Sequence, residues 1–391
     1  MRAGIYLGLV QLLFVTTWTV YVLFLPELAR AAGIAPRWVA WILIADQLIF
    51  AAMDLALGVA AGRVAHVVGR LGRWIAVVGA LSCAAFIGLP FTPGSTALLV
   101  LIIVWAVSAS VLRVPPMLLL GRYAAPAATP WIASLALLGI GLAGALAPIL
   151  TINLRGVDPR LPFALAGGAL LVAVGAMAWC ERHLALDAAA TTPARETTGT
   201  MPRFGPVFLA AVFLLALGTQ VHTAINSGPL YLRQVGPGLL DMLMPSFWVG
   251  FALLVLPAAW LIRVGEPAEV LVIGAAGGAL CLSLVQVAPG LVTTVALQLG
   301  LGGAWACVFA AALNAALAAA RGASGARMVG MLFAALALAA ALRIGMGVAG
   351  WPASAEFARA LHWLPPLAWA AAMVFLLAIP KRSQSGAGLR T

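Results

Sequence analysis

Twelve long apolar runs divide this chain, and their lengths limit what it can fold into. A helix needs about 20 predominantly apolar residues to cross the hydrocarbon core of a bilayer. Most of the runs reach that length, and we interpret the first as a retained span because eleven more follow it. The sequence therefore predicts an all-α polytopic membrane protein with 12 transmembrane helices. The runs cover residues 4–26, 38–61, 74–92, 96–120, 131–153, 163–180, 206–228, 243–262, 269–288, 291–320, 328–350 and 366–380.

The composition excludes several other classes of protein. Hydrophobic residues make up 64% of the 391 positions and charged residues only 8%, whereas soluble domains carry about 25% charged residues. A soluble enzyme, a disordered chain and a secreted disulfide scaffold are therefore ruled out. The net charge of +11 does not indicate nucleic-acid binding, because the basic residues stand singly at the ends of the apolar runs and form no basic stripe.

The loop charges predict an orientation in the membrane. With the N-terminus in the cytoplasm, fourteen basic residues fall on the cytoplasmic side, six fall on the opposite side and two lie inside runs. Cytoplasmic loops carry the excess of Arg and Lys in membrane proteins. We therefore expect both termini to be cytoplasmic, and we expect the protein to lie in a bacterial inner (plasma) membrane.

A polar stretch divides the runs into six and six. We predict an N-terminal half over 1–180, a cytoplasmic linker over 181–206, a C-terminal half over 207–380 and a cytoplasmic tail over 381–391. Short matches recur at offsets of 199 to 203 residues, which favours two pseudo-symmetric six-helix bundles; Pro26, Arg30 and Gly33 correspond to Pro229, Arg233 and Gly236, and Trp105 corresponds to Trp305. Such repeats around a central linker are typical of transporters.

The loop after the second run carries a recognisable motif. Its residues are Gly62, Ala65, His66, Gly69 and Arg70, followed by Arg73. With the twelve runs and the six-plus-six division, this loop resembles the major facilitator superfamily, whose signature there reads G-x-L-A-D-R-x-G-R. In that family the Asp helps to latch the two halves together. His66 stands in its place, either as a weaker, pH-dependent partner or as a solvated loop histidine.

Four ionisable side chains lie well inside the runs: Asp46 and Asp54 in the second, Arg113 in the fourth and Arg343 in the eleventh. A lone charge at mid-membrane costs at least about 2.5–3.5 kcal/mol, so each needs a partner or a water-filled cavity. Counting from the ends of the runs matches Asp46 with Arg343 in depth, and Asp54 with Arg113. The family resemblance implies that runs two and eleven face each other across the halves.

We therefore hypothesise that Asp46 and Arg343 form a bridge that closes the external side. Asp54 and Arg113 would pair within one half. The alternative is that both pairs are static and only neutralise each other.

Arg113 has a second unusual feature. Pro115 and Pro116 follow it, and they leave the carbonyls of Val111 and Leu112 without their usual helical donors. Broken helices at membrane depth tend to line cavities. Since the resemblance implies that the fourth run lines the central pathway, Arg113 is our leading candidate for contact with an anionic substrate. The alternative is a kink near the end of the run, with Arg113 tied to Asp54.

The resemblance also implies that runs one, four, seven and ten line the pathway. The seventh is the most polar, with six polar residues in nine positions. We interpret them as a cavity face, with hydrogen bonding between helices as the alternative. His222 titrates ordinarily near neutral pH and is a candidate coupling-proton site, as are Asp46 and Asp54. The predicted pathway residues besides Arg113 are Trp18, Thr219, His222, Thr223, Asn226, Trp305 and Asn314.

Together these features predict a secondary active transporter, not an enzyme, that works by alternating access. Its substrate would be a small organic solute, anionic or neutral, with a possible coupling proton. A drug or metabolite exporter is one alternative; a polytopic membrane enzyme or a signalling protein on the same fold is another. We find no phosphate-binding loop and no metal-ligand cluster, so we expect no cofactor and no metal. The expected partners are the solute and membrane lipids, with no nucleic acid, and we expect a monomer.

Overall fold

The computed structural model describes residues 1–64, 70–189, 205–319 and 325–378, and within these ranges the chain is helical without a β-strand. The first half comprises α1 (Arg2–Ala31), α2 (Val39–Val64), α3 (Arg70–Gly88), α4 (Ser95–Ala109), α5 (Val114–Tyr123), α6 (Thr129–Asn153), α7 (Arg160–Gly175) and α8 (Met177–Ala189). The second comprises α9 (Gly205–Val221), α10 (Ser227–Leu232), α11 (Leu240–Leu243), α12 (Ser246–Val264), α13 (Pro267–Leu284), α14 (Leu291–Ala319), α15 (Gly325–Val348) and α16 (Ala355–Leu377).

These helices form twelve stretches, among the described residues, that are long and apolar enough to cross a membrane. The predicted number of spans is confirmed. Four of the described spans consist of two α-helices with a break between them: the fourth is α4 and α5, the sixth is α7 and α8, the seventh is α9 and α10, and the eighth is α11 and α12. Side chains such as Val77, Val172 and Val292 are exposed on the outside of the bundle, as expected where lipid is the solvent.

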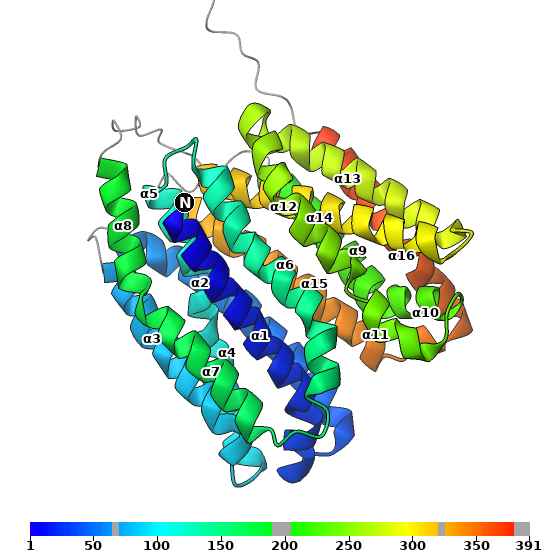
Figure 1. Ribbon diagram of the computed structural model, residues 1–391, viewed down its shortest axis with the longest axis horizontal. Helices are drawn as coiled ribbons and strands as arrows, with labels where there is room; N and C mark the ends of the chain where they lie inside the picture. The colour runs from blue at the N-terminus through cyan, green and yellow to red at the C-terminus, as the bar shows by residue number, and fades with distance from the viewer. Residues whose placement is uncertain (65–69, 190–204, 320–324, 379–391) are drawn as a thin grey trace, which may run out of the picture.

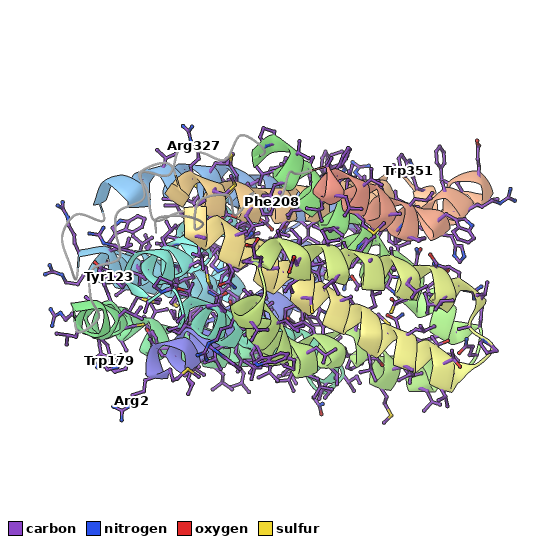
Figure 2. All side chains as sticks on the ribbon, turned by 90° about the horizontal axis from the view of Figure 1, so that it is seen from above. Arg2, Tyr123, Trp179, Phe208, Arg327 and Trp351 are labelled. Atoms are coloured by element: carbon purple, nitrogen blue, oxygen red, sulfur yellow. The ribbon has the colours of Figure 1, made fainter. Side chains whose placement is uncertain are left out.

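Alternate spans run in opposite directions through the molecule. Figure 2 shows Arg2, Tyr123 and Arg327 toward one end and Trp351 toward the other. Arg2 begins the first span, Tyr123 ends the fourth, and Arg327 lies near the start of the eleventh. Their common end is the one that the loop charges assign to the cytoplasm.

The last span differs from its prediction. The run is predicted to begin at residue 366, but α16 begins at Ala355 and contains Pro365 and Pro366. These prolines free the carbonyls of Leu361 and His362, four residues earlier. The side-chain amides of Asn226 and Gln286 donate to those two carbonyls, at 2.9 and 3.3 Å. The helix continues through the proline pair because neighbouring helices supply the missing donors.

The two halves lie side by side and meet along two helix pairs (Figure 1). Helix α2 packs against α15, and α6 packs against α12. Gly58 of α2 and Gly330 of α15 face each other, and a Cβ added to Gly58 would lie 2.9 Å from the carbonyl oxygen of Ala326. Small residues allow backbones to approach this closely, which is how membrane helices gain packing energy.

Helices α12 and α14 of the second half pack closely against each other. Gly250 lies against the carbonyl of Leu299, and Gly302 lies against the carbonyl of Phe247. A methyl group at either glycine would overlap with backbone of the facing helix. Backbone cannot move aside as the tip of a flexible side chain can, so these contacts require glycine.

We predict that Gly302→Ala lowers the stability of the protein by about 1–3 kcal/mol, the usual cost of overpacking. The measurement is the midpoint of thermal unfolding of the purified protein in detergent. Gly277→Ala in α13 is the control, because nothing lies within 4 Å of a Cβ added there. That control should be neutral or gain about 0.5–1 kcal/mol from the better helix former. Equal midpoints for the two variants would contradict the packing argument.

Candidate functional site

The fourth span breaks where its prolines predict. Helix α4 ends at Ala109, a 3-10 turn covers Ser110–Leu112, and α5 begins at Val114, so Arg113 stands at the junction. Pro116 has no backbone N–H, so the carbonyl of Leu112 lacks its usual helical donor. Gln11 of α1 supplies a replacement, since its side-chain amide donates to that carbonyl at 2.9 Å. The break is therefore held in place by a neighbouring helix.

The structure brings Asp54 and Arg113 together at this break. The Arg113 Nε lies 3.1 Å from Oδ2 of Asp54, and a terminal guanidinium nitrogen lies 3.0 Å from the same oxygen. Asp54 is fully buried, whereas 18% of the Arg113 side chain is exposed. A guanidinium has five N–H donors in a fixed fork. Its other N–H groups are therefore available to a second partner.

Arg113 also lies between the two halves. Its guanidinium carbon is 4.9 Å from the ring centre of Phe50 in α2 and 5.8 Å from that of Phe333 in α15. Such distances are within the range of cation–π attraction. Because α2 belongs to the first half and α15 to the second, the charge of Arg113 faces both.

Aromatic rings extend from Arg113 into each half. In the first, Phe50 contacts Trp18 at a centroid distance of 5.6 Å, and Trp18 stacks on Trp105 at 6.0 Å. In the second, Phe333 contacts Phe309 at 6.2 Å, and Phe309 stacks on Trp305 at 5.7 Å. The predicted pathway residues Trp18 and Trp305 are thus each linked to the same cation through aromatic rings of their own half.

Asp46 and Arg343, the predicted bridge between the halves, do not bond to each other in this structure. The Tyr21 hydroxyl donates to Oδ2 of Asp46 at 2.7 Å, so the carboxylate faces a donor in its own half. Oδ1 of Asp46 and Nε of Arg343 are buried and have no hydrogen-bond partner within the described ranges. The depth of two residues in the membrane, counted from the ends of their runs, does not determine which neighbour each side chain faces.

The polar segment of the seventh span has irregular backbone. His222–Asn226 is a π-helical turn between α9 and α10; such turns often occur at functional sites. His222 is fully buried, and its Nε2 lies 3.0 Å from Oε1 of Gln298 in α14. Gln298 in turn reaches the Ser227 hydroxyl at 3.4 Å. The Nδ1 of His222 has no partner in the described part of the chain.

Several predicted pathway side chains bond to backbone. Thr219 and Thr223 donate to the carbonyls of Leu215 and Thr219 in their own span. Asn314 donates to Ala310, and Asn226 holds Leu361. Many of these polar side chains therefore form hydrogen bonds to the backbone of helices. This agrees with the alternative interpretation, in which the polar residues serve hydrogen bonding and do not form a cavity face.

A small cavity of about 140 Å³ adjoins this polar segment. Thr223, Ser227 and Gln298 line it from the second half, together with Trp248. Gly144 and Pro148 of α6 line it from the first half. Of the predicted pathway residues, Thr223 reaches this cavity.

Comparison with solved structures identifies the arrangement. The human organic anion transporter MFSD10 (TETRAN) superimposes with a TM-score of 0.72 over 96% of this chain and 99% of its own, at 14% sequence identity. The major facilitator superfamily transporter FucP, solved in the outward conformation, gives a TM-score of 0.63 over 95% and 97%, at 15% identity. The chain has the major facilitator fold. No family model and no curated protein matches the sequence.

The loop that resembles the major facilitator signature is described only at its edges. Ala65, His66 and Gly69 lie outside the described residues, Gly62 lies in α2, and Arg70 and Arg73 lie in α3.

A carboxylate that the sequence analysis missed lies beside this region. Glu181 of α8 is buried; it accepts from the backbone N–H of Gly72 at 2.7 Å and from the Tyr123 hydroxyl at 3.2 Å. A negative charge at the N-terminal turn of α3 is favourable because of the helix dipole. In this major facilitator fold, Glu181 thus joins the third, fourth and sixth spans.

No group of three or more His, Cys, Asp or Glu side chains that could hold a metal ion occurs in the part of the chain that the structure describes. The candidate site comprises one cation, its carboxylate and two sets of aromatic rings.

We predict that Gln11→Leu lowers stability by about 1–3 kcal/mol, because it leaves the buried carbonyl of Leu112 without a donor. Pro116→Ala in the same chain should restore most of that loss, since an alanine has the backbone N–H that Pro116 lacks. Thermal unfolding of wild type, both single variants and the double variant measures the coupling. Additive effects of the two substitutions would contradict this account of the break.

Proposed function

We propose that this protein is a secondary active transporter of small organic anions that works by alternating access. The observation that carries the proposal is the place of Arg113, between the two halves, partly exposed and with guanidinium donors to spare. A charged group at this depth is costly to maintain and is usually functional. An anion bound there would contact both halves at once.

The surroundings of Arg113 suggest what else the anion carries. Phe50 and Phe333 flank the guanidinium, and Trp18 and Trp305 lie one or two rings further out. Aromatic side chains favour a flat apolar body next to the charge. The human structural neighbour is named an organic anion transporter, which agrees with an anion as the solute.

Alternating access requires that contacts between the halves form and break. In this conformation α5 contacts α14 and α15, at the end of the molecule where the chain begins. With both termini in the cytoplasm of a bacterial cell, these contacts would close the cytoplasmic side. The halves also meet at the opposite end, where α6 contacts α11 and Arg155 lies 4.0 Å from Asp241. The bridge between Asp46 and Arg343 stays a prediction for a state in which the external side is closed.

A proton is the proposed coupling ion, and His222 is a proposed site for it. Its Nε2 is engaged by Gln298, whereas its Nδ1 is free of partners within the described residues. His362 of α16 is a second titratable side chain near His222, and Arg233 in turn lies near His362.

We predict that Arg113→Gln reduces uptake of naphthalene-2-sulfonate into proteoliposomes by about 10- to 100-fold in kcat/KM. Hydrogen bonds to a charged group are worth about 1.5–3 kcal/mol, and each 1.4 kcal/mol is tenfold. Arg113→Lys keeps the charge but loses the forked arrangement of N–H donors. Its kcat/KM for uptake should therefore lie between those of the wild type and Arg113→Gln. Naphthalene-2-sulfonamide, which lacks the charge, is the control solute.

The double variant Asp54→Asn/Arg113→Gln separates solute binding from charge balance. It removes the uncompensated buried carboxylate that Arg113→Gln alone leaves behind. If Arg113 binds the anion, the double variant folds normally and still fails to transport. Normal uptake by the double variant would mean that Arg113 serves only to neutralise Asp54.

We predict that His222→Gln weakens the dependence of uptake on external pH between about pH 5 and 8, where histidine ordinarily titrates, and leaves the part of that dependence that Asp54 carries. Initial rates in proteoliposomes under an imposed pH gradient measure this. His183→Gln in α8 of the other half, where the ring stacks on Trp179, is the matched control and should keep the wild-type profile. An unchanged profile in His222→Gln would exclude His222 as the coupling site without affecting the proposal for Arg113.

A further inference from the structure

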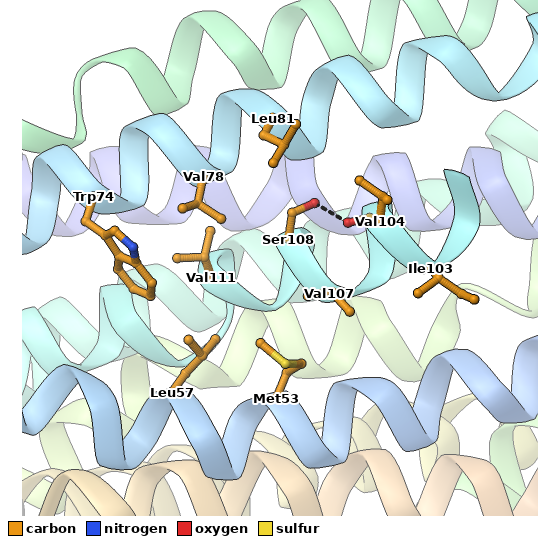
Figure 3. Close-up of a pocket in the computed structure, with 10 residues that line it drawn as sticks. All are labelled: Met53, Leu57, Trp74, Val78, Leu81, Ile103, Val104, Val107, Ser108 and Val111. Carbon is orange, nitrogen blue, oxygen red and sulfur yellow. Dashed lines mark hydrogen bonds between the residues drawn. The ribbon is translucent and has the colours of Figure 1, made fainter. Parts of the chain in front are cut away.

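An apolar groove of about 310 Å³ lies between three helices of the first half (Figure 3). Met53 and Leu57 of α2 form one wall, Trp74 and Val78 of α3 form another, and Val107 and Val111 of the fourth span form the floor. The one hydroxyl among the lining side chains, that of Ser108, donates to the carbonyl of Val104 at 2.6 Å. Apart from the indole N–H of Trp74, the lining side chains therefore offer no free donor to a polar ligand.

The groove is continuous with the lipid-facing surface of the protein. Leu81 and Ile103 line it and are each about half exposed, at 55% and 50%. Both belong to membrane spans, so the solvent at this surface is hydrocarbon. Whatever fills the groove enters from the bilayer and must be apolar, because water and polar groups are excluded at that depth.

The corresponding place in the second half is closed. The predicted duplication pairs spans two and four with spans eight and ten, which are α12 and α14. There Gly250, Gly302 and Gly303 bring the two helices into direct contact. In the first half Met53, Leu57, Val107 and Val111 leave a space between the equivalent helices. The opening is thus a difference between two otherwise similar bundles.

We propose that one acyl chain of a bilayer phospholipid occupies this groove as a bound lipid. The space corresponds to about ten groups of the size of a water molecule, each with about 30 Å³ of liquid volume, and a methylene is of similar size. An empty space of this size would deprive its lining of packing contacts.

The bound chain would touch the helices that hold the candidate site. Met53 and Leu57 flank Asp54 in sequence, and Val111 precedes Arg113 by two residues, within the break of the fourth span. The acyl chain would therefore support the outer side of the segment whose inner side holds the Asp54–Arg113 pair.

The test uses the purified protein in lipid nanodiscs that contain a phosphatidylethanolamine with a diazirine in mid-chain. After illumination, mass spectrometry locates the labelled residues. We expect several-fold stronger labelling at Leu57, Trp74, Val78 and Val107 than at Leu165 and Val172 of α7, which are 64% and 80% exposed. Labelling that simply follows exposure would overturn the proposal, since it is what passing lipids give.

Two variants that fill the groove keep the test independent of any one substitution. Leu81→Trp and Val107→Trp each place a large ring in it, and both should remove the excess labelling. Val77→Trp is the matched control, because Val77 lies one turn from Leu81 on α3, is 70% exposed and does not line the groove. Loss of labelling in Val77→Trp to the same extent would also overturn the proposal.

Discussion

A backbone carbonyl that loses its helical donor inside a membrane must find another, because no water is present to replace it. This chain meets the constraint with side-chain amides from neighbouring helices. Gln11 donates to the carbonyl that Pro116 frees, and Asn226 and Gln286 donate to those that Pro365 and Pro366 free. Each of these three prolines thus ties its span to a particular neighbouring helix.

The position of the candidate site follows from one such pair. Because the Gln11 amide stabilises the break after Leu112, Arg113 stands where the fourth span changes direction. From there its guanidinium reaches Asp54 in the same half and Phe333 in the other. A regular helix would keep this charge within its own half or turn it toward lipid, where it would cost several kcal/mol. The break is what makes the buried arginine tolerable and places it between the halves.

The sequence predicted the number of spans, the break in the fourth and the depth match of Asp54 with Arg113, because each depends on length, hydropathy or proline chemistry along one segment. It could not predict three hydrogen bonds between spans: Tyr21 donates to Asp46, the Gln11 amide donates to the carbonyl of Leu112, and Glu181 accepts from the backbone N–H of Gly72 at the start of α3. These contacts depend on the rotation of one helix relative to another, which periodicity does not define when apolar residues surround the whole helix. The predicted start of the last span was wrong for the same reason, because the donors that let α16 continue through its prolines lie on other spans.

In the proposed transporter, sharing Arg113 between Asp54 and a solute would have an energetic consequence. An anion that binds the guanidinium adds a second negative charge beside a carboxylate that has no exposure to solvent. Two like charges about 4 Å apart repel each other by about 4 kcal/mol at an effective dielectric constant of about 20. A proton on Asp54 removes that repulsion and leaves the cation free for the solute. Anion and proton would then favour each other's binding by the same factor, because coupling between two sites is reciprocal. The proposed site would therefore favour carrying anion and proton in the same direction.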